Sequence, residues 1–335
     1  MLAFLFTFIP TARPYRSCFR LLLGMALAGF CSQPGAQAQG WLAYQSMPQA
    51  GIHATSLNPA FLSRNPYRVD IQLFGGSSLL ANTYLSLRSD SLFSGALGSV
   101  TDSTIDEVFV RKEGQDSYAF MLSSELAGPS LMIAINPKHS VALTSRFRTL
   151  ASVSQLQEAG ARFAIEGLDI PELWDKNLTN DGGQLAVASF LDAGLAYGGE
   201  VFSQGAHSLQ VGAHLRLLRG LAGAYLYADG LTYSLDNADT LNILQSDLDY
   251  AYSANVAAIS PQSPNLQDLR QSLPRNSMGL DIGFSYIYRT KTHALLGLPY
   301  RARIGLGVRD LGGIAFRTSP GTGTFSGSVS GFPLE

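Results

Sequence analysis

The feature that most constrains this chain is a two-residue alternation that runs through several unusually long segments. Apolar side chains at every second position oppose glycine, polar or charged side chains in HSLQVGAHLRLL (207–218), SMGLDIGFSYIYR (277–289) and RARIGLGVRD (301–310). A period of two is typical of a β-strand, because successive side chains point to opposite faces. Such lengths exceed the usual ~5–6 residues of a soluble strand and match a tilted membrane-spanning strand. The sequence therefore predicts a sheet of long strands.

The same period predicts eleven strands along the chain and very little helix. The one helix we expect lies within residues 154–168, where SQLQEAGARFAIEGL carries a weak apolar stripe. The fold class is therefore all-β, with one short helix in a long loop. The predicted strands cover residues 67–74, 79–88, 116–124, 128–136, 140–149, 185–202, 207–219, 223–235, 248–258, 277–289 and 300–310.

The composition of the two strand faces favours a membrane. One face is aliphatic with tyrosines near the strand ends, whereas the other is rich in glycine and carries scattered charges. A lipid-facing exterior around a crowded polar lumen would produce this contrast. No continuous apolar run approaches the ~18 residues of a membrane helix, so an exported membrane protein of this sequence must be a closed antiparallel barrel. The alternative is a large soluble β-sandwich in the periplasm.

The first 38 residues are predicted to be a signal peptide. Three arginines, Arg13, Arg16 and Arg20, precede the short apolar segment 21–30, and AQA (36–38) is a small-residue cleavage pattern. Cleavage removes Cys18 and Cys31, the two cysteines of the chain, and so excludes disulfides and thiolate chemistry. It also leaves 23 − 3 = 20 basic against 25 acidic residues, a net charge of −5. This balance argues against a nucleic-acid partner.

Short and long connections alternate between the predicted strands, as in outer-membrane barrels. NPKH (136–139) and SQGAH (203–207) are short turns, whereas 150–184 and 259–276 are long and polar. If NPKH is periplasmic, the long connections lie outside. Successive connections of a barrel lie on alternate sides of the membrane. This parity argument requires an outer turn at 220–222 and a periplasmic connection at 236–247.

The segment before the first strand is predicted to be a plug. Residues 39–66 contain Asn58-Pro59 and Asn65-Pro66, which turn the chain into a barrel spanning residues 67–317. The residues after it, 318–335, are rich in glycine and serine and are expected to be poorly ordered. The candidate plug and lumen residues are Asn58, Pro59, Arg68, Asp70, His214, Arg216, Asp281 and Arg303.

The sequence contains no pattern that indicates catalysis, a cofactor or a metal site, so we expect a protein that is not an enzyme. There is no Gly-x-Ser-x-Gly elbow and no third glycine at nucleotide-loop spacing. None of the five histidines forms an HxxxH pair, and DNADT (236–240) lacks the glycine and glutamate of a calcium loop.

Several stretches resemble known families of exported bacterial proteins. SLNPAFL (56–62) resembles the Asn-Pro-Ala segment that begins the long-chain fatty-acid and hydrocarbon transporter barrels of Gram-negative outer membranes. Most of residues 50–316 also resemble an uncharacterised family of exported bacterial proteins, a domain of unknown function for which a transporter-like β-barrel is predicted. The quoted similarities are GPSLMIAINPKHSVALTSRFR (128–148), DAGLAYGGEV (192–201), HSLQVGAHLRLLRGLAGAYLY (207–227), GLDIGFSYIY (279–288) and RIGLGVRDLGGIAF (303–316).

The resemblance implies a location and two function classes. The protein would sit in the outer membrane, with the lipid bilayer as its surroundings. It would be a passive uptake channel or binding barrel for small hydrophobic molecules. The alternative is a scaffold or anchor for an envelope or secretion protein partner. The resemblance covers framework features, so it does not choose between the two.

The end of the chain departs from the resemblance. Outer-membrane barrels usually close with a strand that ends in an aromatic residue, whereas this chain ends TGTFSGSVSGFPLE (322–335). The eleven predicted strands are also odd in number. We therefore interpret the sequence as truncated at its C-terminus and expect an open or imperfectly closed barrel.

Overall fold

The computed structural model describes residues 5–8, 42–88, 108–254, 276–289 and 300–333. These residues form one large antiparallel sheet and a separate two-stranded ribbon, β4–β5, with few and short helices. The antiparallel all-β prediction is confirmed. The strands are β1 (Leu5–Phe8), β2 (Val69–Gln72), β3 (Gly75–Asn82), β4 (Leu85–Leu87), β5 (Phe109–Arg111), β6 (Tyr118–Ala127), β7 (Ser130–Asn136), β8 (His139–Leu156), β9 (Leu178–Asn180), β10 (Gly183–Gln204), β11 (His207–Asn237), β12 (Thr240–Tyr252), β13 (Ser277–Tyr288), β14 (Ala302–Gly312) and β15 (Gly323–Pro333).

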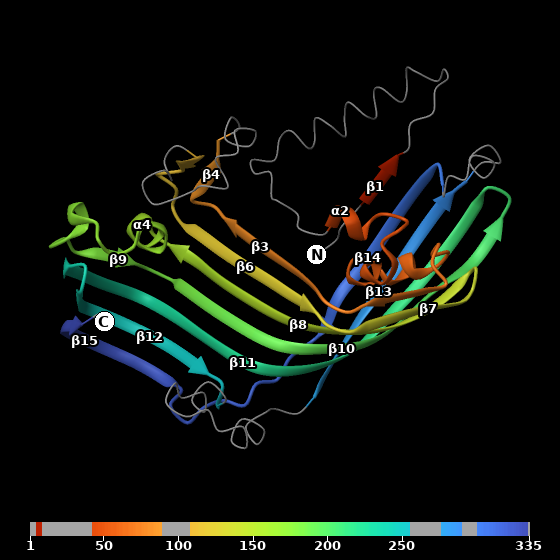
Figure 1. Ribbon diagram of the computed structural model, residues 1–335. Coiled ribbons are helices and arrows are strands. Elements are labelled where there is room, and N and C mark those ends of the chain that lie inside the picture. The colour runs from red at the N-terminus through yellow and green to blue at the C-terminus, as the bar shows by residue number, and fades with distance from the viewer. Residues whose placement is uncertain (1–4, 9–41, 89–107, 255–275, 290–299, 334–335) are drawn as a thin grey trace.

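Three long neighbouring strands, β8, β10 and β11, form the middle of the large sheet (Figure 1). β10 pairs along almost its whole length with β8 and with β11. Two strands pair with successive stretches of the outer edge of β8: first β7 and, further along β8, β6. In the same way β13 pairs with the first part of β11 and β12 with its last part. The sheet therefore has two halves that share the long strands. The hairpin half contains β2, β7, β13 and β14, and the helix half contains β3, β6, β9, β12 and β15.

Two of the predicted turns lie where expected, at the end of the hairpin half. β7 ends at Asn136 and β8 begins at His139, while β10 ends at Gln204 and β11 begins at His207. The Asn136 side chain accepts hydrogen bonds from the amides of Lys138 and His139, at 2.8 and 3.0 Å. A short Asn-based turn thus reverses the chain between β7 and β8.

The prediction of separate strands at 207–219 and 223–235 is wrong, because both belong to the single 31-residue strand β11. The predicted outer turn at 220–222 is instead a register shift in the pairing with β10, where Leu221 is an extra residue. The prediction of a long connection over residues 236–247 is also wrong, because β11 ends at Asn237 and β12 already begins at Thr240. The parity argument therefore fails, although the hairpin half still ends in short turns. The predicted loop 259–276 lies almost entirely outside the described residues.

The outer face of the hairpin half is apolar and exposed. On β11 the outward positions from Leu209 to Leu217 are all aliphatic, and Leu215 is 47% exposed. We call this surface the apolar belt. It crosses seven neighbouring strands and consists of Val69, Ile71, Leu73, Ile133, Ile135, Leu143, Leu195, Tyr197, Leu209, Leu215, Leu217, Met278, Phe284, Tyr286, Ile304, Val308 and Leu311.

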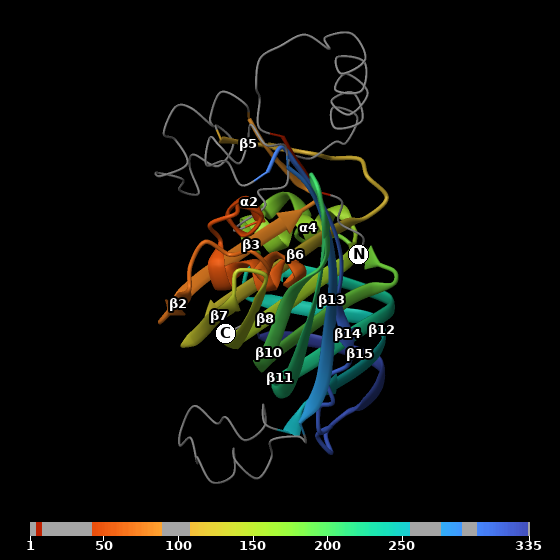
Figure 2. The same ribbon diagram turned by 90° about the vertical axis from the view of Figure 1, so that its right-hand side faces the viewer.

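The inner face of the hairpin half is covered by residues 50–64, which we call the N-terminal segment. It contains two 3₁₀ helices, η1 (Gly51–Ser56) and η2 (Pro59–Leu62), and follows the short helix α2 (Leu42–Gln45). Figures 1 and 2 show these helices on the concave side of the curved sheet. Small apolar clusters fill the space between the segment and the strands: Ile52 and Leu62 with Met132, Ala142 and Ala196, and Ala50, Ala54, Leu57 and Phe61.

The helix half carries the longest helix of the described residues. α4 (Glu158–Glu166) follows β8, and the 3₁₀ helix η5 (Pro171–Leu173) follows α4. The helix predicted within 154–168 is thus confirmed, although residues 154–156 continue β8. No helix among the described residues is both long and apolar enough to cross a membrane.

The sheet is open in the described residues. β14 pairs with β13 and β1, β15 pairs with β12, and neither pairs with β2 or β3 at the opposite edge. The expectation of a poorly ordered tail at 318–335 is wrong for most of its length, because Gly323–Pro333 forms β15. Of the predicted signal peptide, only Leu5–Phe8 lies within the described residues, where it forms β1.

Candidate functional site

A row of four glycines crosses four neighbouring strands beneath the N-terminal segment. Gly198 on β10 is in register with Gly212 on β11, which is in register with Gly283 on β13 and, through it, with Gly307 on β14. A Cβ atom at Gly198 would stand 2.7 Å from the Pro59 carbonyl oxygen, and one at Gly212 would overlap the Pro59–Ala60 peptide. The glycines therefore let the backbone of the segment lie directly on the backbone of the sheet.

Asn58 joins the N-terminal segment to the sheet. Its Oδ1 accepts a hydrogen bond from the Ala60 amide at 2.9 Å and so caps η2, with Pro59 at the first helical position. Its Nδ2 donates to the carbonyl oxygens of Phe284 on β13, at 3.0 Å, and Leu306 on β14, at 3.1 Å. The Asn-Pro pair thus both starts a helical turn and binds two strands.

Two arginines hold the end of the segment. The Arg303 guanidinium carbon lies 3.3 Å from the centre of the Phe61 ring, and Arg303 Nε donates to Ser285 Oγ at 3.3 Å. Arg64 forms a two-point ion pair with Glu200, whose Oε1 accepts from Arg64 Nη2 at 2.9 Å. Arginine suits both contacts, because its planar guanidinium stacks on rings and pairs with carboxylates at two points.

A chain of alternating positive and negative side chains lies on the inner face beside the segment. Asp192 Oδ2 accepts from Arg146 Nη2 at 2.9 Å and from Arg216 Nη1 at 3.0 Å. Arg216 Nη2 then lies 3.0 Å from Asp281 Oδ1 and 2.8 Å from Asp310 Oδ1. Asp192, Arg216 and Asp281 are buried. We call Arg146, Arg148, Arg216, Asp192, Asp281 and Asp310 the charge network. At its edge, Glu125 on β6 lies 3.7 Å from Arg146 Nη1 and 3.8 Å from Arg148 Nε.

His214 occupies a fixed position at the edge of the charge network. Its side chain is fully buried, with Nδ1 3.2 Å from Asp281 Oδ2 and Nε2 3.0 Å from Thr144 Oγ1. Both ring nitrogens therefore have partners, on β13 and β8. The arrangement is that of a structural histidine that ties three strands together.

Ser56 connects the charge network to the N-terminal segment. Arg146 Nη1 donates to Ser56 Oγ at 2.8 Å, and the Arg309 side chain donates to the Ser56 carbonyl oxygen. The end of η1 is therefore bonded to the same arginine that contacts Asp192.

The structure brings together most of the side chains predicted to face the interior. Asn58 and Pro59 lie on the glycine row, Arg303 stacks on Phe61, and the charge network and its edge contain His214, Arg216 and Asp281. Asp70 lies apart from the network and accepts a hydrogen bond from the Ile52 amide at 2.8 Å.

Arg68 is the exception among the predicted residues. It is exposed immediately before β2, where its carbonyl oxygen accepts a hydrogen bond from the Ala134 amide at 2.9 Å. Sequence reasoning missed Arg146, Arg148, Asp192 and Asp310. The signal for the first three was present, because each is a charge at an inward position of a long strand.

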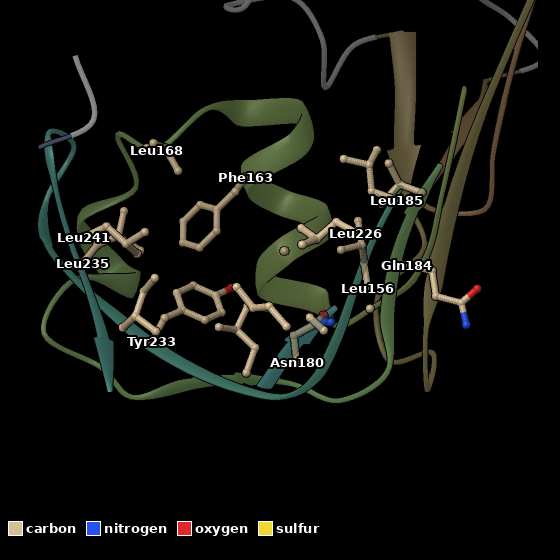
Figure 3. A pocket seen from close by; sticks show the side chains of 17 residues that line it. Leu156, Phe163, Leu168, Asn180, Gln184, Leu185, Leu226, Tyr233, Leu235 and Leu241 are labelled. Carbon is tan, nitrogen blue, oxygen red and sulfur yellow. The ribbon is translucent and has the colours of Figure 1, made fainter. Parts of the chain in front are cut away.

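An apolar cavity of about 440 Å³ lies in the helix half, between α4 and the strands (Figure 3). Residues of β8, α4, β9, β10, β11 and β12 line it; leucine is the commonest of them, and none of these lining side chains is charged. From α4, Gly160 and Phe163 face the cavity. The cavity belongs to the half of the sheet that the N-terminal segment does not cover.

α4 is held over the cavity by contacts on its other side. Ala161 packs against Tyr84 and Tyr118 in a small buried cluster. Glu166 lies 3.0 Å from Arg111 Nε and 3.3 Å from Arg162 Nη2. The helix is therefore anchored to the β4–β5 ribbon and to β6.

Tyr233 is the one lining residue whose polar group enters the cavity without a partner among the described residues. The residue is 9% exposed, its ring centre lies 6.3 Å from that of Phe163, and its hydroxyl points into the cavity (Figure 3). Asn180, by contrast, accepts from the Gln157 amide at 2.8 Å and donates to the Gln155 carbonyl at 3.3 Å. Burial raises the pKa of Tyr233 to about 12, so its hydroxyl is uncharged at neutral pH.

Within the described ranges, no group of three or more histidine, cysteine, aspartate or glutamate side chains is arranged to hold a metal ion. The family model described as "Family of unknown function (DUF5723)" matches residues 59–332. No curated protein and no solved structure matches the chain. The geometry of the chain itself is therefore the basis for assigning a role.

Proposed function

Since this chain belongs to the DUF5723 family of unknown function, we propose a role from its own geometry: it is an outer-membrane β-barrel protein that binds small hydrophobic molecules and lets them cross passively. The protein is non-enzymatic and is exported with the help of residues 1–38.

The observation that carries the proposal is the inverted polarity of the hairpin half. Leu195 and Leu143 are each 60% exposed on the outer face, while Arg216 and Asp281 on the inner face are 2% and 3% exposed. In water this arrangement would leave a large apolar surface unburied and bury charges at a cost. In a bilayer the same arrangement places the aliphatic side chains in lipid and the charges in the protein interior.

The dimensions of the apolar belt suit a bilayer. On β11 it runs from Leu209 to Leu217, which is 217 − 209 + 1 = 9 residues. A tilted membrane strand needs about 9–11 residues. At the end near the short turns, His139 pairs with Tyr197 and His207 with Tyr286 through ring stacking and a hydrogen bond. Aromatic side chains at this level fit a membrane–water interface.

The orientation follows from the connections. Short turns are typical of the periplasmic side of outer-membrane barrels. The hairpin turns after Asn136 and Gln204 favour a periplasmic position for that end. The long connection that carries α4 favours the outer side for the other end, where the turn between Asn237 and Thr240 is nevertheless short. Free edges in lipid would leave backbone groups unbonded at several kcal/mol each, so we include closure of the sheet into a barrel in the proposal.

The apolar cavity favours a hydrophobic ligand over a purely structural role. It has room for a small molecule and presents leucine side chains from β8, β10, β11 and β12. A scaffold for an envelope partner is the second candidate. The specific observation in its favour is the inner face of the hairpin half, which the N-terminal segment and the charge network fill.

The membrane proposal is tested by placing a charge at two leucines of equal exposure. Leu215 in the apolar belt and Leu244 on β12, outside the belt, are 47% and 45% exposed. Leu215→Lys should prevent assembly in the outer membrane, because a charge near the bilayer midplane costs ~2–4 kcal/mol. Leu244→Lys should assemble normally. Equal amounts of heat-modifiable, membrane-inserted protein from both variants would contradict the proposal and favour a soluble periplasmic sandwich.

Export is tested separately. N-terminal sequencing of the protein recovered from the outer membrane should begin at or near Gln39. A mature chain that begins with an acylated Cys31 would show a lipoprotein instead.

A further inference from the structure

We propose that the apolar cavity beneath α4 binds one uncharged molecule of about fifteen non-hydrogen atoms or fewer, and that the Tyr233 hydroxyl donates a hydrogen bond to an oxygen or nitrogen of that molecule. The inference deepens the proposed function and rests on it, because it names the class of hydrophobic ligand.

The size follows from the volume of the cavity. A water molecule takes about 30 Å³ of liquid, so about 440 Å³ corresponds to roughly fifteen heavy atoms. Water itself is a poor occupant, because each buried water needs two to four polar partners. Among the lining side chains of the described residues, Tyr233 is the one with an unpartnered polar group aimed inward. The walls therefore favour an apolar body.

The charge preference follows from the lining. A carboxylate in the cavity would lose its hydration without an ion-pair partner, which is strongly unfavourable. Arg162, which precedes Phe163 on α4, already pairs with Glu166 at 3.3 Å and with Glu172 at 3.1 Å. An alcohol, ketone or ester loses far less on burial, and one hydrogen bond from Tyr233 offsets much of that loss. The cavity thus favours neutral hydrophobic compounds over fatty-acid anions.

The hydroxyl of Tyr233 fixes the orientation of the ligand. The Tyr233 ring packs against the Phe163 ring of α4. The Tyr233 backbone is fixed by strand pairing on both sides, in register with Ile243 and Leu178. No protein group among the described residues accepts a hydrogen bond from this hydroxyl, so a ligand that accepts it gains a bond without displacing one within the protein.

The experiment uses the purified full chain in phosphatidylcholine vesicles and a twelve-carbon primary alcohol that carries a diazirine. After photolysis, mass spectrometry should find the label on cavity residues such as Phe163 and Leu231. Dodecan-1-ol should compete for labelling. Dodecanoate at the same free concentration and at pH 8, where it is ionised, should compete at least tenfold less well.

Three variants locate the site. Tyr233→Phe keeps the ring and should weaken competition by dodecan-1-ol about five- to tenfold, the value of one hydrogen bond of ~1–1.4 kcal/mol. The matched control is Tyr227→Phe, at an exposed tyrosine of the same strand, which should change nothing. Leu231→Trp fills the cavity and should abolish labelling of Phe163 while the protein stays inserted.

The results that would overturn the inference are distinct from those that would overturn the proposed function. Label outside the cavity, equal competition by dodecanoate, or an unchanged Tyr233→Phe variant would each overturn the inference. A parallel measurement compares accumulation of radiolabelled dodecan-1-ol in cells that make the wild-type chain or Leu215→Lys. If wild-type cells accumulate more dodecan-1-ol than Leu215→Lys cells but the cavity is not labelled, only the inference is overturned. If the cavity is labelled but wild-type cells accumulate no more of the alcohol, the inference is supported and passive uptake is contradicted.

Discussion

The backbone of Gly212 on β11 lies directly against the backbone amide of Ala60 in η2, with no space for a side chain between them. This contact is the closest approach of the segment's backbone to the glycine row. It makes the position of the segment sensitive to a single methyl group.

Gly212→Ala should displace the N-terminal segment. The added Cβ would overlap the Pro59–Ala60 peptide, and overpacking of this kind costs ~1–3 kcal/mol. Trypsin should therefore cleave after Arg64 at least several times faster than in the wild type. Gly313→Ala is the matched control, because a Cβ at Gly313 meets no atom within 4 Å. Equal cleavage rates for the two variants would mean that the segment is not held by this contact.

Asp192→Asn should be one of the most destabilising single changes in the chain. It removes the charge between Arg146 and Arg216 and leaves two buried arginines facing each other, at a cost of ~3–5 kcal/mol. Urea unfolding of the protein in detergent micelles measures the loss as a lower transition midpoint. Asp229→Asn, at an exposed aspartate of β11, should leave the midpoint unchanged. A small loss at Asp192, comparable to that at Asp229, would show that the charge network contributes little.

The stacking of Arg303 on Phe61 should appear as a coupling energy. Arg303→Lys keeps the charge but loses the planar guanidinium, and Phe61→Leu removes the ring. Unfolding of the two single variants and the double variant should give a coupling of ~0.5–2 kcal/mol, as expected for a buried cation–π contact. Additive effects would indicate that the two side chains are neighbours without a specific interaction.

The strand pattern could be predicted from the sequence wherever the alternation was unbroken. The segments that became β10, β13 and β14 were placed within a few residues, and the inward positions of His214, Arg216 and Asp281 followed from their phase. Alternation assigns a side chain to a face, and it does so without any knowledge of the neighbouring strand. The pattern therefore predicts which charged side chains face inward. It does not predict that they form one network across five strands.

Glycine was the main source of error. The prediction places Gly220 in a turn and Gly223 at the start of the next strand, but both lie within β11 and leave room for the Phe316 ring. The glycines of the C-terminal stretch were interpreted as disorder, but they lie in β15. A glycine that admits a distant side chain and a glycine that bends the chain look the same in one sequence. Only the register across strands separates them, as it does for the row from Gly198 to Gly307.

The length of β11 determines how far a ligand bound in the cavity lies from the apolar belt. From Leu217, the last residue of the apolar belt on this strand, to Tyr233 the strand continues for 233 − 217 = 16 residues, roughly 50 Å of chain path. A ligand at Tyr233 would therefore be sheltered by protein at some distance from the acyl chains rather than dissolved among them. The cavity would then compete with the surrounding water for its ligand, and its affinity would be set by aqueous solubility rather than by partitioning into lipid.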